Sequence, residues 1–161
     1  MMEINDQLIV FILDNQLLAI PLQLVERVIR AVAITPLRNA PAVIPGIIDY
    51  HGTVVPVFSL RKRLGFPEKP LASSDRFLIL QLASRKLALV IDEIHHITTD
   101  GENPLPDPEK LEEALETEGI TRCKDGLILI YDPEKFLSSS EVFELQKALK
   151  QLKRKEDASH E

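Results

Sequence analysis

Short apolar runs separated by turn residues recur along most of the chain. The first covers residues 8–13, and Asp14-Asn15-Gln16 separates it from a second run at 17–22. Asp and Asn tolerate the backbone of a tight turn, so the two runs predict a β-hairpin. Because residues 8–13 are apolar at every position, we expect that strand to lie between two cores.

The same pattern predicts three further hairpins and one more strand outside them. These elements are expected at residues 47–50 with 53–58, 77–82 with 87–91, 119–123 with 127–131, and 92–98. His51-Gly52 and Asp125-Gly126 supply two of the turns. Most gaps between the strands are too short for crossover helices, which favours small β-barrels over a wound α/β sheet.

Helical spacing is confined to a few short segments and the end of the chain. Apolar residues at 22, 25, 28 and 29 predict a helix over 23–30. Ser59 is placed to cap a helical turn at 60–64 that ends at Gly65. We also expect an exposed loop at 100–108, an acidic helix at 110–116, a helical turn at 132–136 and an amphipathic helix from 141, whose apolar face is expected to pack on its own domain.

Composition narrows the class of protein. The chain has 161 residues, 45% of them hydrophobic, which indicates about one domain with a real core. No apolar stretch is long enough for a transmembrane span, and the first residues lack the pattern of a signal peptide. The single Cys123 cannot form an internal disulfide, which favours a cytoplasmic location. A net charge of −6 and an aromatic content of 5% argue against nucleic acid as a partner.

Catalytic motifs are missing from the sequence. It contains no GxGxxG, GxxxxGK[ST], HExxH or GxSxG pattern. An alternative function remains open, a small acid–base or metal-dependent hydrolase that would use Asp49, His51, Asp92 and His95. His95 and His96 are neighbours on a predicted strand and should point to opposite faces, which disfavours a shared metal ion. Cys123 is expected to be a buried apolar residue rather than a nucleophile.

The remaining picture is a β-rich body with exposed strand edges and no catalytic constellation. Such edges and the apolar grooves between small barrels are common means of protein–protein docking. We therefore expect an interaction module with no cofactor and no metal. A domain that senses a ligand in a closed apolar cavity is a further alternative. The cations Arg61, Lys62 and Arg63 are expected to form a solvated face, or else to contact an acidic partner.

Residues 43–61, VIPGIIDYHGTVVPVFSLR, resemble the signature of the CheW chemotaxis coupling-protein family. The shared features are a Gly, an apolar pair, an x-Gly turn, an apolar–Pro–apolar strand and a Leu-Arg end. Residues 11 and 19–21 resemble the opening hairpin of that family, 87–94 an inner strand and 119–129 the closing hairpin. The resemblance covers about residues 7–137, and the order of its motifs is more specific than any one of them.

The resemblance implies a mostly β fold of two five-stranded SH3-like barrels with short helices and a C-terminal helix. It implies a non-catalytic adaptor that joins a chemoreceptor tip to the regulatory domain of a CheA-type histidine kinase. By matched position, the groove that receives the receptor would include Val25, Arg27, His51, Ala88 and Ile97. It assigns no residue to kinase binding.

Three of those positions depart from the family pattern. The family usually carries Glu where Arg27 stands, Arg where His51 stands and Gly where Ala88 stands. A charge-assisted Glu–Arg contact is therefore not expected here. Glu26 is no simple substitute, because one step along the predicted helix turns a side chain by about 100°.

The expected organisation is one domain over residues 1–153. Residues 66–75, rich in Pro and Ser, are expected to be an internal boundary. The first barrel is expected at about 14–66, and the second at about 7–13 together with 76–137. A C-terminal helix at 139–153 and a disordered tail at 154–161 would complete the chain.

Overall fold

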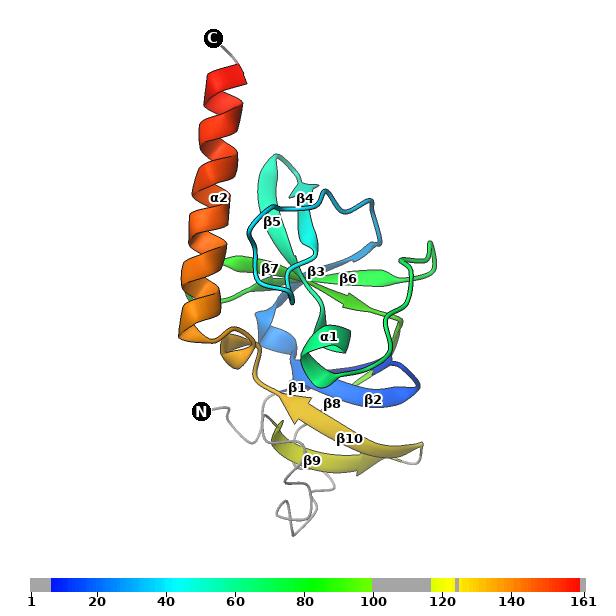
Figure 1. Cartoon of the computed structure of the whole chain (residues 1–161). Helices are drawn as coiled ribbons and strands as arrows, with labels where there is room; N and C mark the ends of the chain where they lie inside the picture. The colour runs from blue at the N-terminus through cyan, green and yellow to red at the C-terminus, as the bar shows by residue number, and fades with distance from the viewer. Residues whose placement is uncertain (1–6, 100–116, 124, 160–161) are drawn as a thin grey trace.

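Two five-stranded sheets and a long C-terminal helix make up the fold (Figure 1). The computed structural model describes residues 7–99, 117–123 and 125–159. Sheet A has the strand order β8-β1-β2-β10-β9 and sheet B the order β3-β6-β7-β5-β4. The strands of sheet A are β1 (Gln7–Leu13), β2 (Gln16–Pro21), β8 (Glu93–Thr99), β9 (Thr117–Cys123) and β10 (Gly126–Tyr131). Those of sheet B are β3 (Val25–Arg30), β4 (Gly46–Tyr50), β5 (Thr53–Phe58), β6 (Arg76–Gln81) and β7 (Lys86–Ile91).

The helical elements are short except for the last. They are η1 (Leu22–Leu24), α1 (Leu60–Leu64), η3 (Pro133–Lys135) and α2 (Ser139–Ser159). As predicted, Ser59 caps α1 by accepting a hydrogen bond from the Lys62 backbone N–H, and Gly65 ends the helix in the left-handed region at φ 75°. The predicted loop at 100–108 and helix at 110–116 lie outside the described residues.

All four predicted hairpins are present, as is the additional strand, β8. The β1–β2 turn consists of Asp14 and Asn15 with φ of 52° and 64°, which is the left-handed geometry that these residue types tolerate. His51 and Gly52 form the β4–β5 turn with φ of 51° and 86°. The short apolar runs and the turn residues between them therefore located the local β-structure.

The prediction of a helix over residues 23–30 is wrong. Residues 22–24 form a single 3-10 turn, and the chain then runs as strand β3, antiparallel to β6. Val25, Val28 and Ile29 are β-branched or extended-chain formers, and β6 offers them a ladder of hydrogen bonds. The register shifts between Val25 and Arg27, so Glu26 occupies a bulge.

The predicted division of the strands between two barrels is also wrong. Sheet B uses the continuous stretch 25–91, and sheet A joins residues 7–21 to 93–131. Strand β2 stays with β1 because a two-residue turn pairs them along their whole length. Residues 66–75 connect two elements of sheet B and are no boundary, and the chain crosses between sheets at η1 and at Asp92.

A large apolar core lies between the two sheets, and each sheet encloses a smaller one. Leu8 and Val10 of β1 point into the core of sheet A, whereas Ile9, Phe11 and Leu13 point into the shared core. The prediction of a strand between two cores is thus confirmed. Strand β6 does the same from the other sheet, with Phe77 and Ile79 inside sheet B and Leu78 and Leu80 in the shared core.

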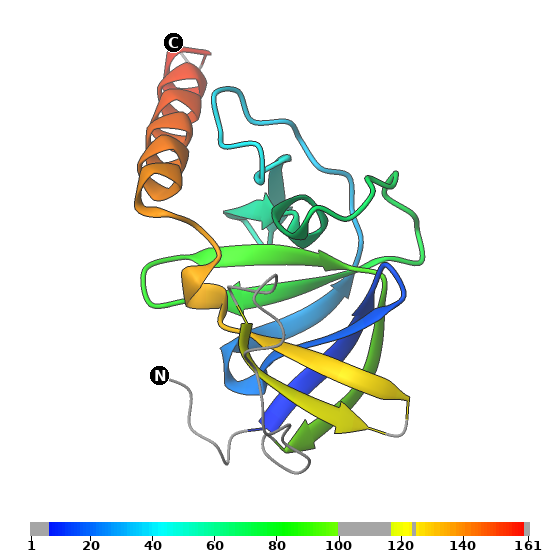
Figure 2. The same ribbon diagram turned by 60° about the horizontal axis from the view of Figure 1, so that its bottom comes forward.

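Helix α2 packs its first turns against the shared core and then stands clear of the body (Figures 1 and 2). Leu145 is fully buried and Leu149 packs beside it, as the amphipathic pattern predicted. The helix continues to Ser159, past residue 153 where the sequence predicted its end, so 154–159 are not the disordered tail that we expected. Residues 160 and 161 lie outside the described residues.

Candidate protein-interaction site

Three partly exposed apolar side chains lie on strand faces that otherwise pack on the shared core. Ile97 of β8 lies directly opposite Ile9 of β1, so both side chains project to the same face. Ile9 is buried in the shared core, but Ile97 is 52% exposed. From sheet B, Val25 is half-buried against the same core and Val28 is 40% exposed. We call Val25, Val28 and Ile97 the junction strip.

Val28 was missed in the sequence because the predicted helix placed it on a buried face. In the strand it lies opposite Leu78, which belongs to the shared core. Since β3 is an edge strand of sheet B, nothing on its outer side covers Val28 among the described residues. A strand interpretation of 25–30 would have placed Val28 and Arg30 on one face and Arg27 and Ile29 on the other.

Arg27 and His51, both exposed, lie side by side at one end of sheet B. The Arg27 Nη1 atom is 3.4 Å from the His51 Nε2 atom. Arginine stays protonated, so Nη1–H donates and Nε2 accepts with its lone pair. The Tyr50 ring makes an edge contact with the imidazole, with 4.6 Å between the ring centroids. The structure therefore brings together two of the predicted site residues that are far apart in the sequence.

Glu26 does not supply the acidic side chain that is missing at position 27, although the reason differs from the predicted one. From the bulge in β3, Glu26 forms an ion pair with Lys86 of β7. The hydrogen bond from Lys86, assisted by the Tyr50 hydroxyl, lowers the pKa of the Glu26 carboxyl below its usual value. The carboxylate nearest in sequence is thus committed to another cation.

Ala88 does not lie at a surface. Its exposed fraction is 0%, and its side chain packs in the core of sheet B with Val57 and Ile79. A partner cannot contact this side chain in the folded protein. The resemblance therefore placed Ala88 correctly within an inner strand, but the structure removes it from the set of residues that can face a partner.

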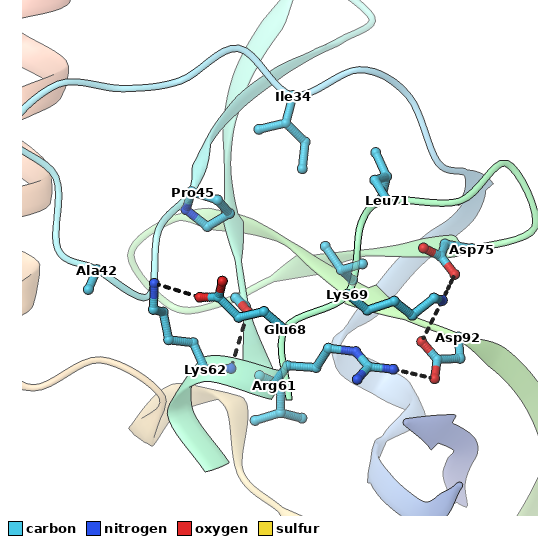
Figure 3. Close-up of a pocket in the computed structure, with 13 residues that line it drawn as sticks. Ile34, Ala42, Pro45, Arg61, Lys62, Glu68, Lys69, Leu71, Asp75 and Asp92 are labelled. Atoms are coloured by element: carbon cyan, nitrogen blue, oxygen red, sulfur yellow. Dashed lines mark hydrogen bonds and ion pairs between the residues drawn. The ribbon is translucent and has the colours of Figure 1, made fainter. Parts of the chain in front are cut away.

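A cluster of ionic side chains joins the two sheets on another side of the molecule (Figure 3). Arg61 of α1 binds Asp92, with 2.7 Å between Nη2 and Oδ2, and Asp14, with 3.2 Å between Nη1 and Oδ1. Lys69 binds Asp75 at 2.9 Å and approaches Asp92 at 3.5 Å. We call Asp14, Arg61, Lys69, Asp75 and Asp92 the junction cluster. Asp92 is the residue at which the chain passes from β7 to β8, so this cluster ties the crossing point to α1 and to the loop at 66–75.

The carboxyl group of Asp92 is held in its ionised form within the junction cluster. Burial alone raises the pKa of its carboxyl, but hydrogen bonds from Arg61 and the Asp14 backbone N–H, with the charges of Arg61 and Lys69, leave that pKa below its usual value. Hydrogen bonds to the charged form favour ionisation in this way. A carboxylate held ionised by two cations is a poor general acid or base near neutral pH.

A pocket of about 260 Å³ lies beside the junction cluster. Apolar side chains of Ile34, Pro45 and Leu71 form one wall, and Arg61, Lys69 and Asp92 form the other (Figure 3). The charged wall is internally paired, and the pocket is not the closed apolar cavity that a ligand-sensing domain would need. The pocket therefore supports no binding of a small molecule.

The four residues of the hydrolase alternative contact different groups. The Asp49 carboxylate accepts from the Gly52 backbone N–H at 2.9 Å within its own turn, and His51 contacts Arg27. Asp92 belongs to the junction cluster, whereas the His95 Nε2 atom lies 3.1 Å from Asp125. No shared reaction centre forms, and the hydrolase alternative is not supported.

His95 and His96 do not point to opposite faces as predicted. Val10 pairs with His96 and Phe11 with Ile94, which leaves His95 in a bulge of β8. The bulge turns both rings toward one another, with their Nδ1 atoms in contact and 4.7 Å between the ring centroids. Even so, within the described ranges no three His, Cys, Asp or Glu side chains gather as a metal site would require.

The cationic triplet at 61–63 is not the solvated face that we expected. Arg61 belongs to the junction cluster, Lys62 pairs with Glu68 at 3.1 Å and Arg63 pairs with Glu141 of α2. Each cation therefore stabilises a different contact of α1. The side chain of Cys123 lies outside the described residues. Over the part of the chain that the structure describes, no helix is both long and apolar enough to cross a membrane.

Comparison with known proteins identifies the family. The family model of the CheW-like domain matches residues 7–141. The chemotaxis protein CheW of Treponema pallidum is 27% identical over 154 residues, which cover 89% of this chain and 91% of that protein. The chemotaxis protein CheW of Bacillus subtilis is 25% identical over 131 residues, covering 80% of this chain and 84% of that protein.

A solved structure agrees with these sequence matches. The crystal structure of the scaffolding protein TtCheW from Thermoanaerobacter tengcongensis superposes with a TM-score of 0.69 at 28% identity. The superposed region covers 78% of this chain and 88% of the TtCheW chain. The predicted fold class, mostly β with two five-stranded SH3-like units and a C-terminal helix, is thereby confirmed.

Proposed function

Because this chain belongs to the family of CheW-like domains, a family of non-catalytic chemotaxis adaptors, we propose that it couples a chemoreceptor to the regulatory domain of a CheA-type histidine kinase. The match of the family model to residues 7–141 carries the proposal, since it spans both sheets and the crossing points between them. The adaptor acts in the cytoplasm, where the signalling tip of a receptor and its kinase meet.

The receptor-binding surface in this proposal wraps around the edge strand β3, with the junction strip on the face toward the shared core and Arg27, beside His51, on the other face. Val28 and Ile97 expose apolar area on the face that otherwise packs on the shared core, and Val25 lies at the edge of that core. A helix of a receptor tip can cover such area with its own apolar side chains, which releases water and favours binding. Ala88 can act only through the core beneath this surface.

The apolar contact is tested best at Ile97, since its exposed side chain contributes little to the core. Replacing Ile97→Asp places a charge in the proposed interface, and we expect the affinity for a receptor tip fragment to fall at least about tenfold. Leu127→Asp is the matched control, because Leu127 lies on the same sheet and is equally exposed at 51%, against 52% for Ile97.

Isothermal titration of the purified full chain with a receptor tip fragment measures both variants. Circular dichroism and thermal unfolding establish that each variant is folded. The proposal predicts that Ile97→Asp loses affinity and that Leu127→Asp keeps it. Equal affinities for the two variants would refute the placement of the surface, and failure of the wild-type chain to bind any receptor tip or kinase of its organism would refute the adaptor function.

A further inference from the structure

Arg27 forms no ion pair among the described residues, and the Glu26 carboxylate, which feels the charge of Arg27, is bonded to Lys86. The hydrogen-bonding contact of Arg27 is with the Nε2 atom of His51, at the long distance of 3.4 Å. The guanidinium carries five N–H donors in a planar fork, so this contact uses one donor and leaves the rest directed to solvent. The planar fork matches the two oxygens of a carboxylate.

The acidic side chains closest to Arg27 along its own strand and the adjoining turn are already engaged. Glu26 pairs with Lys86 across the bulge of β3. Asp49 closes its own turn by accepting from the backbone N–H of Gly52.

The imidazole beside Arg27 is itself held in position by its neighbours and gives the guanidinium a fixed side chain to lie against. The Tyr50 ring packs against His51 at 4.6 Å, and Tyr50 is itself largely buried in the core of sheet B. His51 is further fixed by the tight turn that it forms with Gly52. A cation that is positioned before binding loses less conformational entropy when it binds its partner.

From this geometry we propose that the receptor helix bound by this chain presents an Asp or Glu carboxylate to Arg27. The inference rests on the proposed function and specifies the chemistry of its partner. Arg27 then selects for receptor tips that place an acidic residue at this point. It selects against tips that place a cation or an apolar residue there, because such a tip would bury the Arg27 guanidinium without a partner.

The charge of position 27 is tested by titrating a receptor tip fragment, encoded in the same genome, into four forms of the full chain. We expect Arg27→Glu to weaken binding by about tenfold or more and Arg27→Gln by less, since the first replaces attraction with repulsion. Arg38→Glu is the matched control: Arg38 is exposed on the loop beside α2, outside the proposed surface, and the variant has the same net charge as Arg27→Glu. It should bind like the wild-type chain.

Single Asp→Lys and Glu→Lys variants of the tip fragment identify the matching carboxylate. One of them should restore the binding of Arg27→Glu while it weakens the binding of the wild-type chain. If Arg27→Glu binds as tightly as the wild-type chain, or if no tip variant restores it, the inference is overturned while the adaptor function stands. If the wild-type chain binds no tip, both fall.

Discussion

Removing the guanidinium of Arg61 tests whether the junction cluster holds the two sheets together. The change Arg61→Met keeps most of the apolar stem but abolishes the contacts to Asp14 and Asp92. It leaves Asp92 with Lys69 at 3.5 Å and the Asp14 backbone N–H at 3.0 Å. Asp14 loses its only ion pair among the described residues.

The magnitude follows from how deeply the groups are buried. The side chain of Arg61 is 13% exposed and that of Asp92 is 23% exposed. Fully buried pairs cost about 3–5 kcal/mol when one partner is removed, and surface pairs about 0–1 kcal/mol. With one partner still held by Lys69, we expect a loss of about 2 kcal/mol in the free energy of unfolding. For a chain of this length that lowers the melting temperature by roughly 4–8 °C.

Urea unfolding followed by circular dichroism at pH 7 measures the change. Lys62→Met is the control, because Lys62 is the next residue of the same helix and its ion pair with Glu68 is exposed, at 45% and 78%. It should cost less than about 0.5 kcal/mol. A double-mutant cycle of Arg61→Met with Asp92→Asn should give a coupling of about 1 kcal/mol. Equal effects of Arg61→Met and Lys62→Met, or a coupling near zero, would refute the reasoning.

Two further predictions concern backbone packing and pH. A Cβ atom on Gly46 would lie 2.1 Å from the Thr35 carbonyl oxygen, so Gly46→Ala should break the hydrogen-bonded bridge between Thr35 and Ile47 and cost about 3 kcal/mol in thermal unfolding. Gly52→Ala, which meets no atom within 4 Å, should cost only about 1 kcal/mol for its positive φ, and a similar loss for both would contradict this. The folded-state pKa values of Asp92 and Glu141 are lowered, so the stability they contribute is complete above about pH 5 and is lost as the pH falls through those values. Asp92→Asn should flatten the pH dependence of urea unfolding between about pH 5 and pH 3, and an unchanged slope would count against that account.

The local β-structure was predictable because each hairpin has its own turn chemistry. Asp14-Asn15 and His51-Gly52 adopt the positive φ that such turns require. The segment 25–30 was not predictable by the same means. It is an edge strand that exposes residues on both faces, so its apolar positions do not alternate cleanly and also fit a helix.

The pairing between hairpins could not be predicted from the sequence, for a different reason. Strand β2 joins β10 and strand β5 joins β7, both in parallel, over long stretches of intervening chain. No turn connects these partners, so no local residue pattern encodes which hairpin meets which. The division of strands between the sheets depends on these two contacts and on the pairings of β1 with β8 and of β3 with β6, and it is the part of the fold that we predicted wrongly.

The candidate site was predictable only in part. The resemblance supplied positions 27 and 51, and the structure brings their side chains together. The junction cluster was not predictable, because Arg61 meets Asp14 and Asp92 from 47 and 31 residues away. In the sequence its arginine was indistinguishable from Lys62, whose ion pair with Glu68 lies at the surface. Val28 would have been found had the strand been recognised.

The insertion of sheet B into sheet A imposes an order on biosynthesis. As the ribosome extends the chain, the hairpin β1–β2 emerges first, yet its partner strands β8 and β10 are translated only after all of sheet B. Sheet B is continuous and can close while synthesis proceeds, whereas the opening hairpin waits with apolar side chains on both of its surfaces. Until β10 is made, this nascent hairpin is the segment most exposed to aggregation and most in need of a chaperone.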